Sequence, residues 1–301
     1  EVLKAHGYAT KLVGKWHCGD QPEFLPTRHG FDEYYGIPYS NDMGRFAGRP
    51  EKKQWPPLPL LADEDVVEEQ FDQRSVTFRY AEQCTRFIRE HRDGPFFLYL
   101  AHMHVHLPHY VAERFLKESR NDRYGGGVAA IDWATGVIME ELRRQGIDDR
   151  TLVLFTSDNG SRNDFGPSNG PLRGTKATTW EGGQRVPLIA RWPGQIPAGA
   201  TCDGIASAID LMPTLSALAG ADVSQAATSG VEGGNPIDGC DIRPLMLNPD
   251  SASPRTTFAY YWMNQLEAVR SGDWKLHFRK RDNATLELYH LADDMGETRN
   301  R

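Results

Sequence analysis

Apolar runs separated by polar, glycine-containing turns recur along the chain and predict buried strands. The runs are Thr10–Trp16, Pro95–Met103, Thr151–Ser157 and Val186–Trp192. Each is largely apolar at consecutive rather than alternate positions, which is typical of strands that are covered on both faces. Such strands pair in parallel sheets, so the pattern favours a mostly parallel sheet flanked by helices.

Helical periodicity appears between some of these runs. From Phe71 to His91, apolar residues repeat every three to four positions, with charged side chains opposite. The pattern returns from Val128 to Arg144, and Gly146 stands where a left-handed C-terminal cap forms. A further helix is predicted after Asp210, which is a suitable N-cap residue. This order of strands and helices predicts an α/β fold.

The chain changes character after residue 223. Residues 224–256 are polar and rich in Gly, Pro and Ser, and we interpret them as a connecting segment. Beyond it, turns separate the short strand candidates Thr257–Tyr261, Leu266–Arg270, Trp274–Arg279 and Glu287–Leu291. They predict a small antiparallel sheet. The expected organisation is a main domain in residues 1–223, the connecting segment 224–256, and a C-terminal α+β subdomain in residues 257–301 that is itself incomplete.

Composition excludes several classes of protein. The 301 residues carry 34 Lys and Arg against 41 Asp and Glu, a formal net charge of −7. A nucleic-acid partner is not expected, because binding to a phosphate backbone needs a basic surface. No apolar run approaches the ~20 residues of a membrane-spanning helix. The cysteines are too widely spaced for a zinc knuckle or a small disulfide scaffold: Cys18, Cys84, Cys202 and Cys240.

The first residues predict an internal fragment. The chain opens with Glu1 rather than Met, and Val2, Leu3 and Ala5 lead into Gly7, which is a helix-stop position. We therefore expect the end of an amphipathic helix whose beginning is missing.

Chemistry-bearing residues follow three of the four strand candidates. In an open parallel sheet, ligands bind beyond the carboxyl ends of the strands. One sheet edge is therefore expected to collect the polar residues that follow these strands, namely Lys15 and His17, then His102, His104 and His106, then Asp158 and Asn159.

Asp158 and Asn159 offer hard oxygen ligands on a turn that Gly160 permits, which suits Ca²⁺ or Mg²⁺. A plain strand-end turn is the alternative, since this composition is common in turns. Lys15 and His17 share one face of a strand end, where a cation and an imidazole can grip an anion. A solvated strand end is the alternative, and the pair by itself favours it.

His102, His104 and His106 also alternate on one face and could bind Zn²⁺ or supply a general acid. Alternatively, two of the three pack or hydrogen-bond at a strand end. The segment from Asn169 to Gly183 is rich in glycine, which lets the backbone approach a ligand, and its Lys176 can reach an oxyanion. The other interpretation is a plain connecting loop.

Together these residues predict metal-assisted hydrolysis of an anionic ester. A nucleophile is not evident, because the 301 residues contain neither a GxSxG elbow nor a Cys or Ser that starts a C/S-x-P-x-R stretch.

Several segments, in this order, resemble the sulfatase family of the alkaline-phosphatase-like superfamily, of arylsulfatase type. The resemblance extends from Leu3 to Glu297 and implies the superfamily's fold and cleavage of sulfate monoesters. The matching segments are GYATKLVGKWHCG, HGFDEYYGIPYSNDM, HMHVHLPHY, FTSDNG, GPLRGTKATTWEGGQRVPLIARWPG and ELYHLADDMGET.

For the cationic and metal-binding residues, the resemblance implies that Asp158 and Asn159 are ligands of one divalent cation, usually Ca²⁺. It implies that Lys15 and Lys176 hold the sulfate oxygens of the substrate.

For the histidines, the resemblance implies that His17 orients and deprotonates the formylglycine hydrate that serves as nucleophile in this family. His106, which stands before x-Pro, would contact the substrate and assist the leaving oxygen, with His104 as the second candidate.

The chain departs from the family pattern in two ways. The family's C/S-x-P-x-R motif and its paired metal-binding aspartates lie upstream of GKWHxG, a region that is absent from these 301 residues. We therefore expect residues 1–223 to be an incomplete catalytic domain, and the chain by itself to be inactive. Cys18 replaces the usual Leu beside His17, and we expect this change to be tolerated.

The family implies a sulfated glycan or aryl substrate, a formylglycine-generating maturation enzyme as partner, and export from the cytoplasm. Loops such as Phe46–Asp63 and the C-terminal sheet are expected to set the substrate. Two other functions fit the same residues. One is a non-catalytic protein that binds sulfated glycans, and the other is a phosphodiesterase or phosphonate hydrolase of the same superfamily.

Overall fold

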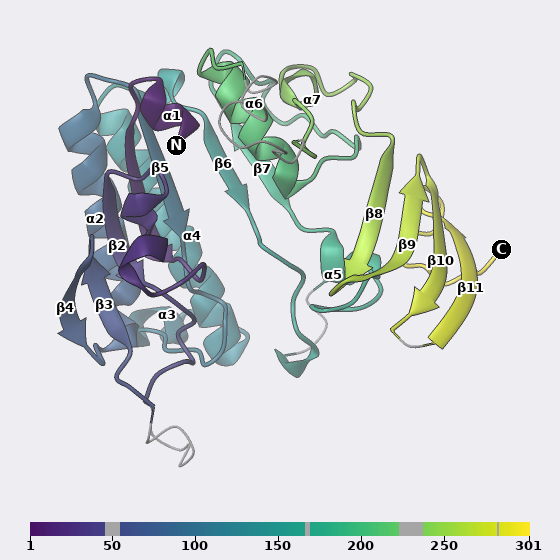
Figure 1. Cartoon of the computed structure of the whole chain (residues 1–301), viewed down its shortest axis with the longest axis horizontal. Helices are drawn as coiled ribbons and strands as arrows, with labels where there is room; N and C mark the ends of the chain where they lie inside the picture. Colours follow the sequence, from purple (N-terminus) through teal and green to yellow (C-terminus); the bar gives the residue numbers. More distant parts are fainter. Residues whose placement is uncertain (46–54, 166–168, 223–236, 282) are drawn as a thin grey trace. The chain divides into compact units, whose positions relative to one another are not determined.

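The computed structural model describes residues 1–45, 55–165, 169–222, 237–281 and 283–301 (Figure 1). They form two compact units. Unit 1 comprises Glu1–Asp149 and Leu218–Asp222, and unit 2 comprises Arg150–Ala217 and Val223–Arg301. Part of the predicted connecting segment (224–236) and part of the predicted specificity loop (46–54) lie outside the described residues. Each unit is treated by itself below.

Unit 1 is built on a five-stranded sheet in the order β4-β3-β2-β1-β5. The central strand β1 runs parallel to both β2 and β5, whereas β3 and β4 are antiparallel. All five inner residues of β1 are buried, as expected for a strand covered on both faces. The strands are β1 (Ala9–Lys15), β2 (Glu33–Ile37), β3 (Pro59–Ala62), β4 (Asp65–Glu69) and β5 (Phe96–Ala101).

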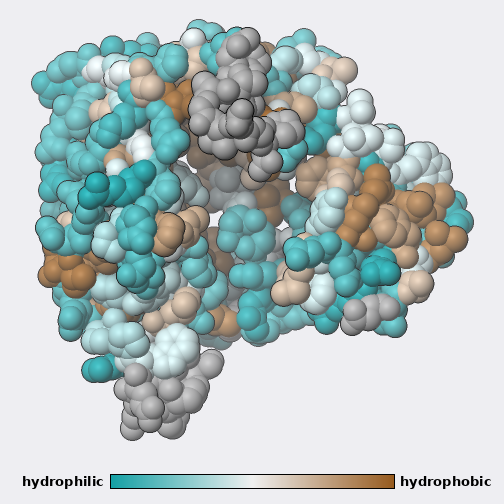
Figure 2. All heavy atoms as spheres, in the orientation of Figure 1, coloured by the Kyte–Doolittle hydropathy of each residue, from teal (hydrophilic) through white to brown (hydrophobic). Residues whose placement is uncertain are grey.

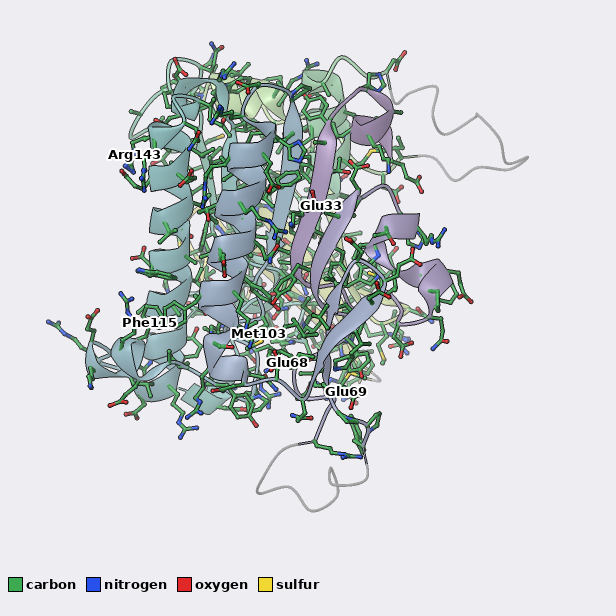
Figure 3. The ribbon with its side chains drawn as sticks, turned by 90° about the vertical axis from the view of Figure 1, so that its left-hand side faces the viewer. Glu33, Glu68, Glu69, Met103, Phe115 and Arg143 are labelled. Carbon is green, nitrogen blue, oxygen red and sulfur yellow. The ribbon has the colours of Figure 1, made fainter. Side chains whose placement is uncertain are left out.

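Helices cover one face of this sheet. Val13 on β1 and Tyr80 on α2 belong to the same buried cluster, and α4 packs against α2 (Figures 1 and 3). A second cluster on the other face joins Leu12 to Leu25, which lies between two short 3-10 turns, η1 (Pro22–Phe24) and η2 (Pro26–Arg28). The helices are α1 (Val2–Ala5), α2 (Val76–His91), α3 (Glu113–Lys117) and α4 (Asp122–Arg144). The prediction of a mostly parallel sheet flanked by helices is confirmed.

Unit 2 contains two sheets. Strands β6 (Val153–Thr156) and β7 (Leu188–Arg191) form an antiparallel pair. The expectation that one sheet edge collects the polar residues after three of the strand candidates is therefore wrong for those after β6, because β6 takes its hydrogen bonds from β7 rather than from β1 or β5. The other helices of the described chain are α5 (Glu181–Gln184), α6 (Leu211–Leu218) and α7 (Arg243–Leu247).

Asp210 does not act as the simple N-cap that its position before α6 predicts. It ends the 3-10 turn η7 (Ala208–Asp210), and its carboxylate accepts a hydrogen bond of 2.7 Å from the backbone N–H of Ser207. Arg255 pairs with the same carboxylate. Asp210 thus fixes the entry to α6 from inside the turn.

The C-terminal strands form the predicted antiparallel sheet, in the order β11-β10-β9-β8. Its polarity is unusual, since Lys275 and His277 of β10 are buried while Leu276 between them is exposed. Apolar side chains cover part of the outer surface of this sheet (Figure 2), including Leu286 of β11, which is 76% exposed. The strands are β8 (Thr257–Trp262), β9 (Gln265–Ser271), β10 (Trp274–Lys280) and β11 (Asn283–His290).

Within the described parts of the chain, none of the helices combines the length and the apolar content needed to cross a membrane.

Candidate functional site

The carboxyl ends of the parallel strands in unit 1 approach each other very closely. A Cβ on Gly14 would lie 2.0 Å from the carbonyl oxygen of Ala101 on β5, and one on Gly36 of β2 would lie 1.8 Å from the carbonyl oxygen of Gly14. Neither position tolerates a side chain without movement of the backbone. Lys15 follows Gly14 directly, so these contacts fix where the β1 end of the candidate site begins.

Lys15 and His17 lie where β1 ends, as predicted. The segment after β1 runs beside the segment after β2, because the backbone N–H groups of Trp16 and His17 donate to the carbonyls of Ile37 and Pro38 at 3.0 and 2.9 Å. His17 is exposed and adopts a positive φ of 61°, which ends the extended strand and turns the chain away. This conformation sets the direction of its imidazole independently of strand alternation.

His106 contacts residues that sequence reasoning missed. Its Nδ1 lies 3.1 Å from Oδ1 of Asn41 and 3.4 Å from Oγ of Ser40, in the segment after β2. Both partners are buried, and Nδ1 also lies 2.7 Å from its neighbouring carbonyl at Leu107. The only signal in the sequence was the position of Ser40 and Asn41 just after an apolar strand. Polar groups from the ends of β1, β2 and β5 therefore meet at one sheet edge.

His102 and His104 are packed inside unit 1. Their rings stack at 5.1 Å, and Nδ1 of His102 accepts the backbone N–H of His104 at 3.0 Å. Burial lowers the pKa of His102 to about 3 and that of His104 to about 4, and His104 adds to the shift of His102 while His109 adds to that of His104. Both rings are therefore neutral at pH 7, which favours the packing interpretation for these two histidines and leaves His106 as the candidate for proton chemistry.

In unit 2 the Asp158–Asn159 turn lies against the Lys176 loop, which we define as residues 173–183. The backbone N–H of Gly160 donates to Gly183 at 3.1 Å, and that of Lys176 donates to Ser161 at 3.0 Å. A Cβ on Gly160 would lie 1.8 Å from the carbonyl oxygen of Gly182, so this contact requires glycine. The fold thus brings three predicted site residues of unit 2 to the same place.

The oxygen donors of Asp158 and Asn159 fit the chemistry of a hard divalent cation. Asp158 is exposed, and Asn159 is partly buried where Ser157 donates to its backbone carbonyl at 3.0 Å. A carboxylate and an amide oxygen are ligands that Ca²⁺ takes, but Ca²⁺ needs about six to eight oxygens. The turn therefore supplies part of a ligand set and requires further donors.

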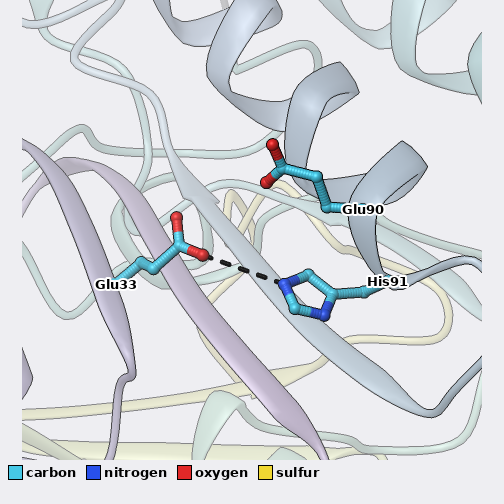
Figure 4. A group of neighbouring side chains, drawn as sticks. All are labelled: Glu33, Glu90 and His91. Atoms are coloured by element: carbon cyan, nitrogen blue, oxygen red, sulfur yellow. Dashed lines mark ion pairs between the residues drawn. The ribbon is translucent and has the colours of Figure 1, made fainter.

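A different group of possible ligands, formed by Glu33, Glu90 and His91, lies at the amino end of β2 (Figure 4). It lies at the opposite end of that strand from Ser40 and Asn41. The buried ammonium of Lys11 already pairs with Glu33 at 2.7 Å, and His91 Nε2 lies 3.8 Å from the same carboxylate. Because Lys11 supplies the positive charge that a metal ion would bring, we interpret this group as an ion-pair network.

The Lys176 loop is held by a buried ion cluster. The Glu181 carboxylate accepts hydrogen bonds from Lys275 Nζ at 2.9 Å and from the Tyr260 hydroxyl at 3.0 Å. Glu297 accepts from the Glu181 backbone N–H at 2.7 Å and from Lys275 Nζ at 3.1 Å. We call Glu181, Lys275, Glu297 and His277 the buried ion cluster.

Direct contacts between oppositely charged groups balance the charges inside the buried ion cluster. Burial acts to raise the pKa of Glu297, but the hydrogen bond from His277 and the charge of Lys275 outweigh it and hold the pKa below its usual range. His277 Nε2 lies 2.6 Å from Glu297, yet burial keeps the pKa of His277 below its usual value. Arg173, at the start of the loop, donates to the Glu297 carbonyl at 2.9 Å and packs 3.6 Å from the Trp180 ring. Both ends of the Lys176 loop are thereby fixed to the C-terminal sheet.

An α/β protein with cations and histidines at its strand ends and an oxygen-rich turn beside a cationic loop is equipped to bind an anionic ester. The chain belongs to the sulfatase family, whose model matches residues 1–221. A second model, the C-terminal region of N-sulphoglucosamine sulphohydrolase, matches residues 175–301.

Named relatives agree with this assignment. The chain is 38% identical to N-acetylgalactosamine-6-sulfatase of Sus scrofa over 97% of this chain and 56% of the relative. It is also 38% identical to arylsulfatase A of Bos taurus, over 92% of this chain and 57% of the relative. The chain thus spans little more than half the length of these relatives.

Solved structures confirm the fold. The structure of Ps i-CgsB in complex with k-i-k-neocarrahexaose matches with a TM-score of 0.81 and 29% identity, over 99% of this chain and 68% of that one.

The burial of His102 and His104 predicts a pH dependence. Unfolding exposes both rings and returns their pKa to about 6.5. Between that value and the folded values of about 3 and 4, the unfolded chain binds more protons, so stability falls as pH drops through this window. We expect the ring signals of both histidines in NMR spectra to stay constant from pH 8 to 5. A midpoint near 6.5 for either ring would contradict its burial.

The buried ion cluster predicts a large effect of Lys275→Met. The substitution keeps the volume but leaves two buried carboxylates without their cation, so we expect a loss of about 3–5 kcal/mol in unfolding free energy. Urea unfolding followed by tryptophan fluorescence measures it. Lys117→Met, which removes an exposed lysine of α3, is the matched control and should change stability by less than about 0.5 kcal/mol. Adding Glu297→Gln to Lys275→Met should recover part of the loss, and equal effects of the two lysine variants would exclude this role for Lys275.

Proposed function

We propose that the protein containing this chain hydrolyses sulfate monoesters, with a sulfated glycan as substrate. The observation that carries the proposal is the sulfatase family match over residues 1–221, a range that includes every residue we single out for the site. A relative named N-acetylgalactosamine-6-sulfatase and a similar structure in complex with a neocarrahexaose support a carbohydrate substrate.

Two cations serve the sulfate group in this proposal. Lys15 and Lys176 contact the nonbridging sulfate oxygens, whose charge they neutralise as the ester bond breaks. The close strand contacts at Gly14 support a fixed position for Lys15, and the anchored loop does the same for Lys176. Fixed cations need no reorganisation during the reaction, which makes them more effective than mobile ones.

Asp158 and Asn159 hold one divalent cation, Ca²⁺ by preference, together with further oxygen donors. When bound, the cation supplies positive charge and lowers the energy of a developing oxyanion. The chain's own contribution is the oxygen donors on a turn that is hydrogen-bonded to the Lys176 loop. Such bonding couples the position of the metal ligands to that of the sulfate-binding lysine.

The histidines move protons. His106 protonates the bridging oxygen that leaves with the sugar, and its contacts with Ser40 and Asn41 hold the imidazole in place. His17, exposed where β1 ends, orients the nucleophile and accepts its proton. In this family the nucleophile is a formylglycine, so the proposal includes a formylglycine-generating enzyme as maturation partner.

The turnover prediction concerns Lys176→Ala. We expect the complete gene product, coexpressed with a formylglycine-generating enzyme, to cleave 4-nitrophenyl sulfate faster than 4-nitrophenyl phosphate. Lys176→Ala removes one charge-stabilising group, so we expect it to lower kcat by roughly 10²–10³. The control Lys117→Ala should leave kcat unchanged.

Two outcomes would contradict the proposal. Preference for the phosphate ester would favour a phosphohydrolase or phosphonate hydrolase. Binding of sulfated glycan without any turnover would favour a non-catalytic protein.

The metal prediction concerns Asp158→Ala. In calorimetric titrations, Asp158→Ala should bind Ca²⁺ at least tenfold more weakly than the unchanged protein, because one anionic ligand is lost. Asp158→Asn, which keeps one oxygen donor, should fall between the two. Asp93→Ala removes an exposed carboxylate in the turn before β5 and serves as the control. Identical Ca²⁺ affinities for the unchanged protein and Asp158→Ala would remove Asp158 from the ligand set.

A further inference from the structure

A pocket of about 310 Å³ opens in unit 2 beside the Lys176 loop. One wall starts at Ala177, the residue after Lys176, and continues along the loop, while the hairpins of the C-terminal sheet form the other walls. None of the functions proposed above uses this pocket. The lining residues that matter to its chemistry are Thr178, Trp180, Trp262, Glu267, Lys280 and Arg281.

Each of two indole rings in the pocket is paired with a cation. Lys280 Nζ lies 3.7 Å from the centre of the Trp180 ring, and the guanidinium of Arg281 lies 5.2 Å from that of Trp262. Lys280 also donates to the Thr179 hydroxyl at 2.9 Å, and its Nζ lies 2.5 Å from Nδ1 of His277, so its ammonium is held against the loop and the buried ion cluster. Burial lowers the pKa of Lys280 to about 8, so the ammonium stays mostly charged at neutral pH.

The one acidic side chain among the pocket residues named above, Glu267, has a buried carboxylate. Glu267 is 3% exposed, and its Oε2 accepts the Thr179 hydroxyl at 2.6 Å. Its other oxygen accepts the backbone N–H of Arg281. With both oxygens occupied, Glu267 fixes the two walls to each other. Lys280 is held by Thr179, His277 and the Trp180 ring, so the accessible charge of the pocket is that of the exposed Arg281, and an anion is the favoured ligand.

We propose that this pocket is an accessory subsite that binds an anionic sugar unit, sulfated or carboxylated, adjacent to the sugar whose ester is cleaved. The chemistry of the pocket carries the proposal. Arg173 and Lys280 cover the Trp180 ring. The indole of Trp262, by contrast, presents a flat apolar face that packs against the C–H face of a sugar ring, and the guanidinium of Arg281 pairs with sulfate through two parallel hydrogen bonds. A neutral sugar would use only the first of these features.

Position and size support the same occupant. Ala177 and Thr178, the two residues after Lys176, line the pocket, which places it beside the loop that carries the lysine we assign to the scissile sulfate. The volume lies at the lower end of the range for small-molecule sites, about 300–1,000 Å³, and suits a single ring. This subsite rests on the proposed function, which it deepens by naming an anionic oligosaccharide as the substrate.

The test uses sucrose octasulfate as a probe with many sulfates and sucrose as its neutral counterpart, titrated calorimetrically into the complete gene product. We expect Arg281→Ala and Trp262→Ala each to weaken binding of sucrose octasulfate at least fivefold, and sucrose itself to bind far more weakly. Arg279→Ala removes an exposed arginine of β10 outside the pocket and is the matched control. Arg281→Lys and Trp262→Phe, which keep the charge or the ring, should recover part of the affinity.

Turnover of 4-nitrophenyl sulfate, which has no second sugar, separates this subsite from the catalytic proposal. It should be unchanged in Arg281→Ala and Trp262→Ala, which shows that both variants fold. Unchanged affinity for sucrose octasulfate in both variants would overturn the subsite even if the protein is a sulfatase. Equal binding of sucrose and its octasulfate would overturn the anionic preference. Weakened binding in a protein that cleaves no sulfate ester would support the pocket and reject the catalytic proposal.

Discussion

The arrangement of unit 2 depends on two buried ion pairs that share Lys275. Their partners are the carboxylates of Glu181 and Glu297. All three are at most 1% exposed. Moving charges out of water is unfavourable by several kcal/mol for each ion, so these groups are stable only when they are all in contact. Their geometry therefore allows little variation. Since Glu181 belongs to the Lys176 loop and Lys275 to β10, the loop can occupy only the position in which the charges meet.

The same requirement explains the inverted polarity of the C-terminal sheet. A sheet with one solvated face usually directs its apolar residues inward, yet β10 directs Lys275 and His277 inward and exposes Leu276. Charged residues on the inner face provide little nonspecific attraction, but they accept only partners of matching charge and shape. The Lys176 loop gains a defined position from these buried charges. In unit 1, where β1 and β5 meet, the equivalent restriction is steric and comes from Gly14.

Much of this fold follows from patterns that are local in the sequence. The period of α2 and α4, the consecutive apolar residues of β1 and the short, turn-separated runs of the C-terminal sheet all predicted elements that the structure contains. Pairing between distant strands is not local, which is why an apolar run such as β6 revealed a strand but not its partner β7. The candidate site likewise has features that are local in the sequence and features that are not. Residues directly after strands were found, whereas the contact of Asn41 with His106 depends on how β2 and β5 flank β1.

The Lys176 loop carries both the lysine that we propose for sulfate binding and part of the proposed sugar subsite. Its start, at Arg173, and its end, at Glu181, are fixed by contacts with the C-terminal sheet. Between them, the backbone of Lys176 is hydrogen-bonded to the segment that follows the Asp158 turn. The loop residues after Lys176 line the pocket together with Trp262 and Arg281. Because the loop is held at both ends, a shift in the position of Lys176 also moves the loop residues that line the pocket. Under the proposed function, changes in substrate preference can then arise through the exposed side chains of the C-terminal hairpins, while the buried charges beneath them keep Lys176 in place.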